Sequence, residues 1–209
     1  MYNFGFIESK IDGTEHIFDA PASMDIPEFY SYIPNLPPVL DQGSEPICVT
    51  CSVSAYLDWK ESLKTGIPVD NHIKRRDIYN AKTNAGDGMT YKDAFHYLRH
   101  HGVNSNAGLL KIGSYAMVRN PYALKCALIS NGPCFGATPV YGDDFIREPE
   151  FWREDNGQYC GGHAISIVGY TPEGFIIRNS WGTIYGQRGY YLLKYEDYKS
   201  LMEAWTVTG

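Results

Sequence analysis

Apolar side chains in the first half of the chain recur at the spacing of helices. Between Ser44 and Gly66 they return every three or four residues, and a Gly-Ile-Pro run ends the pattern. Ser44, Glu45 and Pro46 suit a first turn, so this spacing predicts a helix that begins near Ser44. The same periodicity predicts further helices over 73–82, 90–100 and 122–130.

The rest of the chain follows other patterns. Five prolines make residues 1–40 irregular or extended. From Cys134 onward the apolar runs are short and separated by glycines, which is typical of strands joined by tight turns. These runs occupy residues 134–140, 163–170, 174–181 and 189–195. We therefore expect an α+β protein whose helical and β lobes meet near residue 110, with a site in the cleft between them.

Composition and charge narrow the function classes. The 209 residues are 44% hydrophobic, 14% aromatic and 20% charged, as in a soluble globular protein. A net charge of −6 and the absence of long basic runs argue against nucleic acid as a partner. No apolar run approaches the ~20 residues of a membrane span, and the first residues lack a secretory pattern, so we expect no membrane partner and a cytoplasmic location. Five cysteines leave an odd thiol, which favours reduced thiols.

Two cysteines, Cys48 and Cys51, lie in the predicted first helix. A cysteine nucleophile reacts as its thiolate, and the partial positive charge of a helix N-terminus lowers a thiol pKa. Cys48 lies in the first turn, whereas Cys51 lies one turn deeper on the packed face and is expected to fill the core. As a Cys-x-x-Cys pair they could also bind zinc or act in redox chemistry, but no second pair stands at ligand spacing, so no metal site is predicted.

A base and its supporting groups follow in the β half. His163 comes after two glycines and before an apolar run, which places its ring at the lip of a strand. Asn179 can orient that ring, and Trp181 can shield the pair from water. Gln42 precedes Cys48 closely enough to point its amide at the oxygen of a tetrahedral intermediate.

Three stretches occur in a fixed order, QGSEPIC, GGHAISIVGY and RNSWGTIYGQRGY, and together they resemble the papain-like cysteine peptidases. The resemblance covers most of the chain and implies a two-lobe fold with a helical N-terminal lobe and an antiparallel, barrel-like β lobe. It also implies a monomer that hydrolyses peptide or protein substrates without a metal or organic cofactor. The roles implied are nucleophile for Cys48, base for His163, orienter for Asn179, oxyanion donor for Gln42 and shielding indole for Trp181.

The sequence departs from the family pattern beside the nucleophile. Many secreted members carry a cysteine three residues before it, bridged to a partner near the glycine-rich wall of the cleft, but here that position is Glu45. Ile47 and Val49 replace the usual small and aromatic neighbours of Cys48. The substrate-binding residues are expected to be Gly86, Gly88, Gly161, Gly162 and Trp181.

A short leader precedes the family-like part of the chain. We place the leader at 1–25 and the peptidase domain at 26–209, with a helical lobe over 26–110 and a β lobe over 111–209. This leader is far shorter than the pro-domain of many members and resembles that of some microbial relatives, which suggests a microbial or viral source. Whether it blocks the cleft, is removed or braces the lobes stays open.

Other interpretations compete with the peptidase. The chain could be a catalytically silent binding or structural module, or an acyltransferase or ligase in which an amine resolves the acyl-enzyme. His96 and His100 stand one turn apart and could share a metal, although a solvated helix face is the simpler interpretation. Cys160 is expected to be structural. The acidic residues 143–144 and 148–155 are expected to form a solvated loop that could favour basic peptides.

Overall fold

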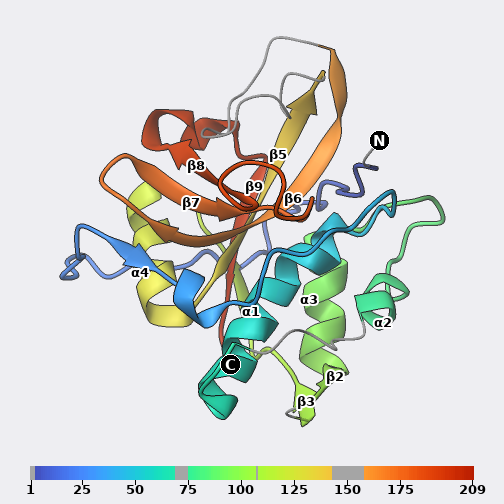
Figure 1. Cartoon of the computed structure of the whole chain (residues 1–209), viewed down its shortest axis with the longest axis horizontal. Helices are drawn as coiled ribbons and strands as arrows, with labels where there is room; N and C mark the ends of the chain where they lie inside the picture. Colours follow the sequence, from blue (N-terminus) through green and yellow to red (C-terminus); the bar gives the residue numbers. More distant parts are fainter. Residues whose placement is uncertain (1–2, 69–74, 107, 143–157) are drawn as a thin grey trace.

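The computed structural model describes residues 3–68, 75–106, 108–142 and 158–209. In Figure 1 the strands of the large sheet, β5 to β9, gather above and helices α1, α2 and α3 lie below them, so two unlike lobes face each other. The helices are α1 (Cys48–Thr65), α2 (Arg75–Tyr79), α3 (Tyr91–His100) and α4 (Pro121–Asn131), with 3-10 turns at Ile33–Asn35 and Tyr195–Ser200. The fold is the expected α+β arrangement.

The β lobe is one antiparallel sheet of seven strands within the described residues, in the order β4-β9-β5-β6-β7-β8, and β1 pairs with β6. A separate hairpin joins β2 and β3 below α3. The bounds are β1 (Tyr30–Ser31), β2 (Val103–Ser105), β3 (Gly108–Leu110), β4 (Tyr115–Met117), β5 (Cys134–Tyr141), β6 (Tyr159–Tyr170), β7 (Gly174–Arg178), β8 (Tyr190–Lys194) and β9 (Glu203–Val207).

The helices match the predicted pattern except at their starts. The first helix begins at Cys48 and not near Ser44, which corrects the prediction. Pro46 disfavours helical geometry in the residue before it, and Ile47 serves as an N-cap without a side-chain bond. The helix ends where expected, at Gly66 in the left-handed region with φ 75°. α2 is shorter than predicted, and its expected start at 73 lies outside the described residues.

The four predicted strands are present as β5, β6, β7 and β8, but β9 was not predicted. β9 pairs with both β4 and β5 and therefore lies inside the sheet. All five of its residues are buried, including Glu203 and Thr206, so the polar side chains that obscure the strand pattern do not face water.

Helix α1 lies between two hydrophobic cores. One core joins α4 to the sheet, and the other joins α1 and α3 to β5 and β9 through aromatic residues such as Phe95, Phe135 and Trp205. A buried ion pair also links the lobes, because Asp58 of α1 lies 3.9 Å from the Arg178 guanidinium of β7. No helix among the described residues has the length and apolar character to cross a membrane.

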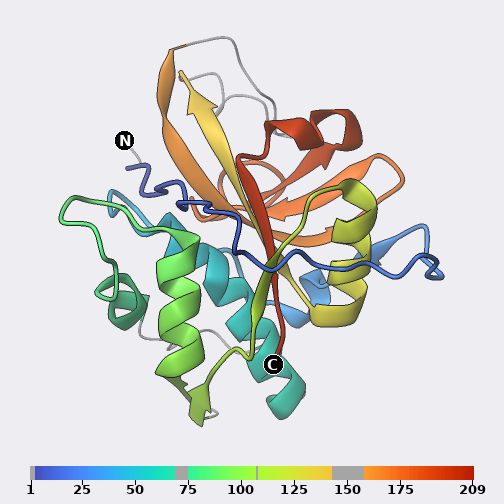
Figure 2. The ribbon, with the colours of Figure 1, turned by 180° about the vertical axis from the view of Figure 1, so that it is seen from behind.

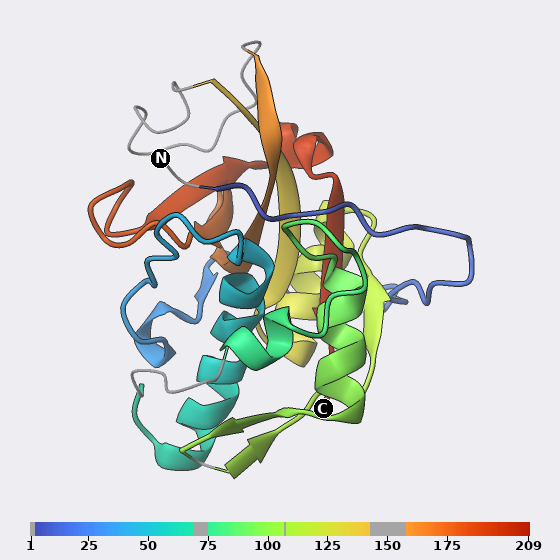
Figure 3. The same ribbon diagram turned by 90° about the vertical axis from the view of Figure 1, so that its right-hand side faces the viewer.

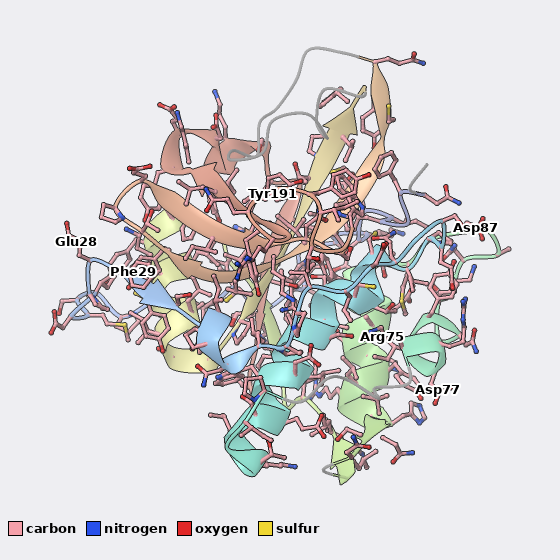
Figure 4. The ribbon with its side chains drawn as sticks, in the orientation of Figure 1. Glu28, Phe29, Arg75, Asp77, Asp87 and Tyr191 are labelled. Carbon is pink, nitrogen blue, oxygen red and sulfur yellow. The ribbon has the colours of Figure 1, made fainter. Side chains whose placement is uncertain are left out.

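The leader crosses the molecule as an extended strap. Phe6 forms bridges with Met89 on one side and Gly162 on the other, and Ile17 forms a bridge with Met117 at the β4 edge of the sheet. Figures 2 and 3 show this dark blue segment running over the sheet and past β9. Figure 4 places Asp87 near the start of the path, and Glu28 and Phe29 at the opposite side of the molecule.

Candidate active site

Cys48 is the first residue of α1 and is completely buried. Burial raises the pKa of its thiol to about 11, although the backbone amides of Ala164 and Gly5 act in the opposite direction. The backbone amides of Val49 and Cys48 at the helix N-terminus lower this pKa as predicted, but burial outweighs them and the net shift is upward. Desolvation dominates here, because the thiol has no access to water, and the leader backbone at Gly5 lies close enough to hydrogen-bond the sulfur.

His163 is held by Asn179 and Trp181. Its Nε2 lies 2.8 Å from Asn179 Oδ1, which also accepts a hydrogen bond from the Ser180 backbone N–H at 2.7 Å. An amide oxygen only accepts, so Nε2 carries the proton and Nδ1 is the nitrogen left to exchange one with the nucleophile. The Trp181 ring stacks on the imidazole at 4.7 Å. Burial lowers the pKa of His163 to about 4, and the hydrogen bond that His163 donates to Asn179 acts in the opposite direction.

Gln42 is buried and its amide is fully engaged. Nε2 donates to the Glu45 carbonyl at 2.9 Å and to the Asn3 carbonyl at 3.1 Å, and Oε1 accepts from Ser180 Oγ at 2.6 Å. The Ser180 hydroxyl fixes which end of the amide faces the cleft. Sequence reasoning missed this role of Ser180, although its place between Asn179 and Trp181 could have suggested it.

The leader fills the space over these groups. The Phe4 ring packs edge-on against His163 and Trp181, with ring centres 6.2 Å apart in each pair. The Phe6 amide donates to the Gly162 carbonyl at 3.3 Å, and Met89 receives and donates hydrogen bonds with Ile7 and Gly5. His163 is fully buried as a result, as is Cys48.

Three of the four predicted wall glycines touch the leader. A Cβ on Gly88 would lie 2.8 Å from the Gly5 oxygen, and one on Gly162 would lie 2.6 Å from the Phe6 ring. A Cβ on Gly161 would lie 2.9 Å from Phe4 Cβ. The structure brings these glycines together with the nucleophile and base, whereas Gly86 has open space around it and does not join them.

Glu203 stands further along the leader path and was also missed. Its carboxylate accepts from the Ser9 backbone N–H at 3.0 Å and from the Trp205 indole. Burial raises the pKa of Glu203, and these hydrogen bonds oppose that shift. An acidic residue in an apolar C-terminal run was the one sequence signal that could have pointed to it.

The remaining candidates lie apart from this group. All five cysteines are unpaired; Cys51 is buried in the core and Cys160 is exposed. The His96 and His100 rings lie 4.4 Å apart on α3, and the described residues contain no cluster of three or more metal-ligating side chains. Glu45, where the family cysteine is missing, pairs with Arg76 of α2. The acidic segments 143–144 and 148–155 lie outside the described residues.

Comparisons with known proteins agree with this geometry. A family model described as papain family cysteine protease matches residues 71–207, which include the base and its orienter. A gut-specific cysteine proteinase of Caenorhabditis elegans is 28% identical over 123 residues, and the cathepsin B-like CP3 of Giardia intestinalis is 36% identical over 74 residues. These matches take in 57% and 33% of this chain, but only 35% and 25% of the two relatives.

Solved structures extend the likeness to the whole fold. Xylellain, a cysteine protease from Xylella fastidiosa, superposes with a TM-score of 0.82 and 21% identity, over 98% of this chain and 95% of that one. The proCathepsin B S9 of Trypanosoma congolense gives 0.81 and 17%, over 98% and 85%. The family match spans well over half of the chain, and the fold is the same: the chain belongs to the papain family of cysteine proteases.

Proposed function

We propose that this chain is a cysteine-type peptidase that hydrolyses peptide or protein substrates through an acyl-enzyme on Cys48. The observation that carries the proposal is the contact between Gln42 Nε2 and the Asn3 carbonyl oxygen. Beside a buried cysteine and an oriented histidine, a peptide carbonyl already occupies a donor suited to an oxyanion. The Asn3 carbonyl thus stands in for the carbonyl of a substrate.

The first half of the reaction forms a thioester. His163 Nδ1 takes the proton from the Cys48 thiol, and the thiolate attacks the carbonyl carbon of the substrate. The oxyanion of the tetrahedral intermediate accepts from Gln42 Nε2 and from the Cys48 backbone N–H, and each such donor lowers the barrier by about 2.7–4 kcal/mol. The imidazolium then gives its proton to the departing amine.

The second half releases the acid product. His163 removes a proton from water, the resulting hydroxide attacks the thioester, and Cys48 leaves as the thiolate. Asn179 keeps Nε2 protonated and the ring in one orientation throughout, while Trp181 limits access of bulk water to the pair. These residues need no metal or organic cofactor for any step.

The described state is a covered, resting form of this site. With the leader in place, burial favours the neutral thiol and the neutral imidazole, whose pKa values are about 11 and about 4. A reactive thiolate–imidazolium pair therefore requires the leader to move. We propose that Phe4→Ala, which removes the ring packed on His163 and Trp181, increases turnover of a fluorogenic peptide.

Labelling with an epoxide active-site probe tests the assignment. We expect Cys48→Ala to abolish both labelling and turnover, and Cys51→Ala to retain both. Labelling that follows Cys51 would overturn the nucleophile. A silent module would show no turnover even in the Phe4→Ala chain, and a ligase would transfer the acyl group to an added amine in preference to water.

A further inference from the structure

We propose that Ser52, Ser166 and Tyr91 form a buried interlobe clamp that positions Cys48 against His163. They are positioning residues, because they act through the helix and strand that carry the reacting groups. The inference rests on the proposed function, and it adds a determinant of the sulfur–imidazole geometry that lies outside the group of Cys48, His163, Asn179 and Gln42.

The clamp is built from reciprocal hydrogen bonds between α1 and β6. Ser52 Oγ donates to the Ile165 carbonyl at 2.7 Å, and Ser166 Oγ donates back to the Ser52 carbonyl at 2.8 Å. The Tyr91 hydroxyl lies 2.8 Å from Ser52 Oγ and donates to the Gly136 carbonyl of β5 at 2.8 Å. Four elements, α1 and α3 of the helical lobe and β5 and β6 of the sheet, therefore meet at one point.

The clamp lies on the same helix and strand as the reacting groups. Ser52 lies one helical turn after Cys48 on α1. Ser166 lies on β6, the strand that also carries His163. Any slide or rotation of α1 against β6 moves the Cys48 sulfur relative to the imidazole. The two serines oppose such movement in both directions, because each donates to the other element.

Because the clamp is buried, its hydrogen bonds favour one position of α1 relative to β6. Ser52 and Ser166 are each 2% exposed, and Tyr91 is completely buried among apolar side chains. A hydroxyl or carbonyl that loses its partner in such surroundings gains no water in exchange. A shifted helix would leave several polar groups unpaired at once, so the clamp penalises every register except the one that aligns the nucleophile with the base.

A matched control lies on the same helix. Ser54 is also completely buried, but its hydroxyl donates to the Thr50 carbonyl within α1, and among the described residues it forms no hydrogen bond with another element. Ser54→Ala therefore removes a buried helical hydroxyl without loosening α1 from β6. A difference between Ser52→Ala and Ser54→Ala isolates the interlobe contact from the general loss of a buried hydrogen bond.

The test is the pH profile of Cys48 alkylation by iodoacetamide, followed by mass spectrometry of the Cys48 peptide. All variants are made in the full chain carrying Phe4→Ala. We expect Ser52→Ala to move the acidic limb of the rate–pH profile to higher pH and to slow alkylation near pH 6.5 by about three- to tenfold. This is the effect expected when the Cys48 thiolate and the His163 imidazolium lose the support of one net hydrogen bond. The rate–pH profile of Ser54→Ala should coincide with that of the parent Phe4→Ala chain.

Two further variants keep the result independent of folding. Ser166→Ala should shift the limb in the same direction, and Ser166→Thr, which retains the hydroxyl, should restore it. In the peptide assay, Ser52→Ala should lower kcat and leave KM unchanged, because the Ser52 hydroxyl bonds to Ile165 and Tyr91. The clamp meets the leader through the Tyr91 ring, whose centre lies 5.8 Å from that of Phe6, and this variant leaves that ring in place. Circular dichroism at the assay temperature confirms that each variant is folded.

Coincident profiles for Ser52→Ala and Ser54→Ala would overturn the clamp, as would a loss of stability in Ser52→Ala with an unchanged limb. Failure of the proposed function has a different signature. If the chain hydrolyses no peptide, the alkylation profiles still report whether the clamp sets the reactivity of Cys48.

Discussion

Acidification is expected to release the leader from the cleft. The perturbation is a change from pH 7 to pH 5, and the group that responds is His163, whose pKa is lowered by burial to about 4 from an ordinary value of 6.5. A base with a depressed pKa in the covered state binds a proton more readily once it is uncovered. Lower pH therefore favours opening, within the window between pH 6.5 and about pH 4.

The magnitude follows from the two pKa values. Linkage between 6.5 in the open state and about 4 in the covered state raises the opening equilibrium by about twentyfold between pH 7 and pH 5. Glu203 acts against this, because its raised pKa in the covered state favours protonation there. The shift of His163 is the larger of the two, so opening should still increase.

Hydrogen exchange of leader amides measures the opening without relying on catalysis. The Ile7 amide donates to the Met89 carbonyl at 3.0 Å, and the Met89 amide donates to the Gly5 carbonyl at 2.8 Å, so both exchange only when the leader leaves. In a Cys48→Ala chain, which cannot cleave itself, their protection factors should fall by about twentyfold from pH 7 to pH 5. Amides in the β7–β8 ladder provide the reference.

A His163→Gln variant separates this cause from others, because glutamine does not titrate. Its leader amides should keep the same protection factor at both pH values. An unchanged protection factor in the Cys48→Ala chain would exclude His163 as the group that controls opening, as would the same loss of protection in the His163→Gln chain.

Three other changes should have separable effects. Asn179→Ala should lower kcat by about tenfold to a hundredfold while the probe still labels Cys48, since it removes one oriented hydrogen bond; an unchanged rate would contradict the orienting role. Asp58→Ala leaves the buried Arg178 guanidinium without this carboxylate and should lower the free energy of unfolding by about 3–5 kcal/mol in urea titrations; a loss below ~1 kcal/mol would show that other partners compensate. Glu203→Gln removes an acidic group beside the leader path and should reduce kcat/KM for arginine-containing peptides by about tenfold relative to leucine-containing ones; an unchanged ratio would exclude Glu203 from substrate selection.

The reacting groups could be found from the sequence because each has a local signal. Cys48 stands at the start of an apolar helical pattern, and Asn179 directly follows β7. His163 was expected at the lip of a strand but lies inside β6, which begins at Tyr159. Their surroundings could not be found in the same way. The partners of Phe6 are Met89 and Gly162, which are remote in sequence and carry no complementary pattern.

The direction in which the Cys48 pKa shifts depends on the contact of the leader with the site, which the sequence does not reveal. A helix N-terminus favours the thiolate form of a cysteine that water can reach, and this effect could be predicted from the sequence. The opposing effect is the desolvation imposed by the leader, which outweighs the helix in the covered state. β9 was missed for a related reason, because Glu203 is polar in sequence but buried in the fold.

The leader occupies groups that the proposed reaction also needs, and this has a kinetic consequence. Gln42 holds the Asn3 carbonyl, and the Gly162 carbonyl holds the Phe6 amide, so a substrate cannot use either while the leader is bound. A tethered segment acts at an effective concentration on the order of millimolar. A free peptide at micromolar concentration must therefore bind about a thousandfold more tightly to displace it. Turnover of the full chain then reports leader opening together with chemistry, and only comparison with the Phe4→Ala chain separates the two.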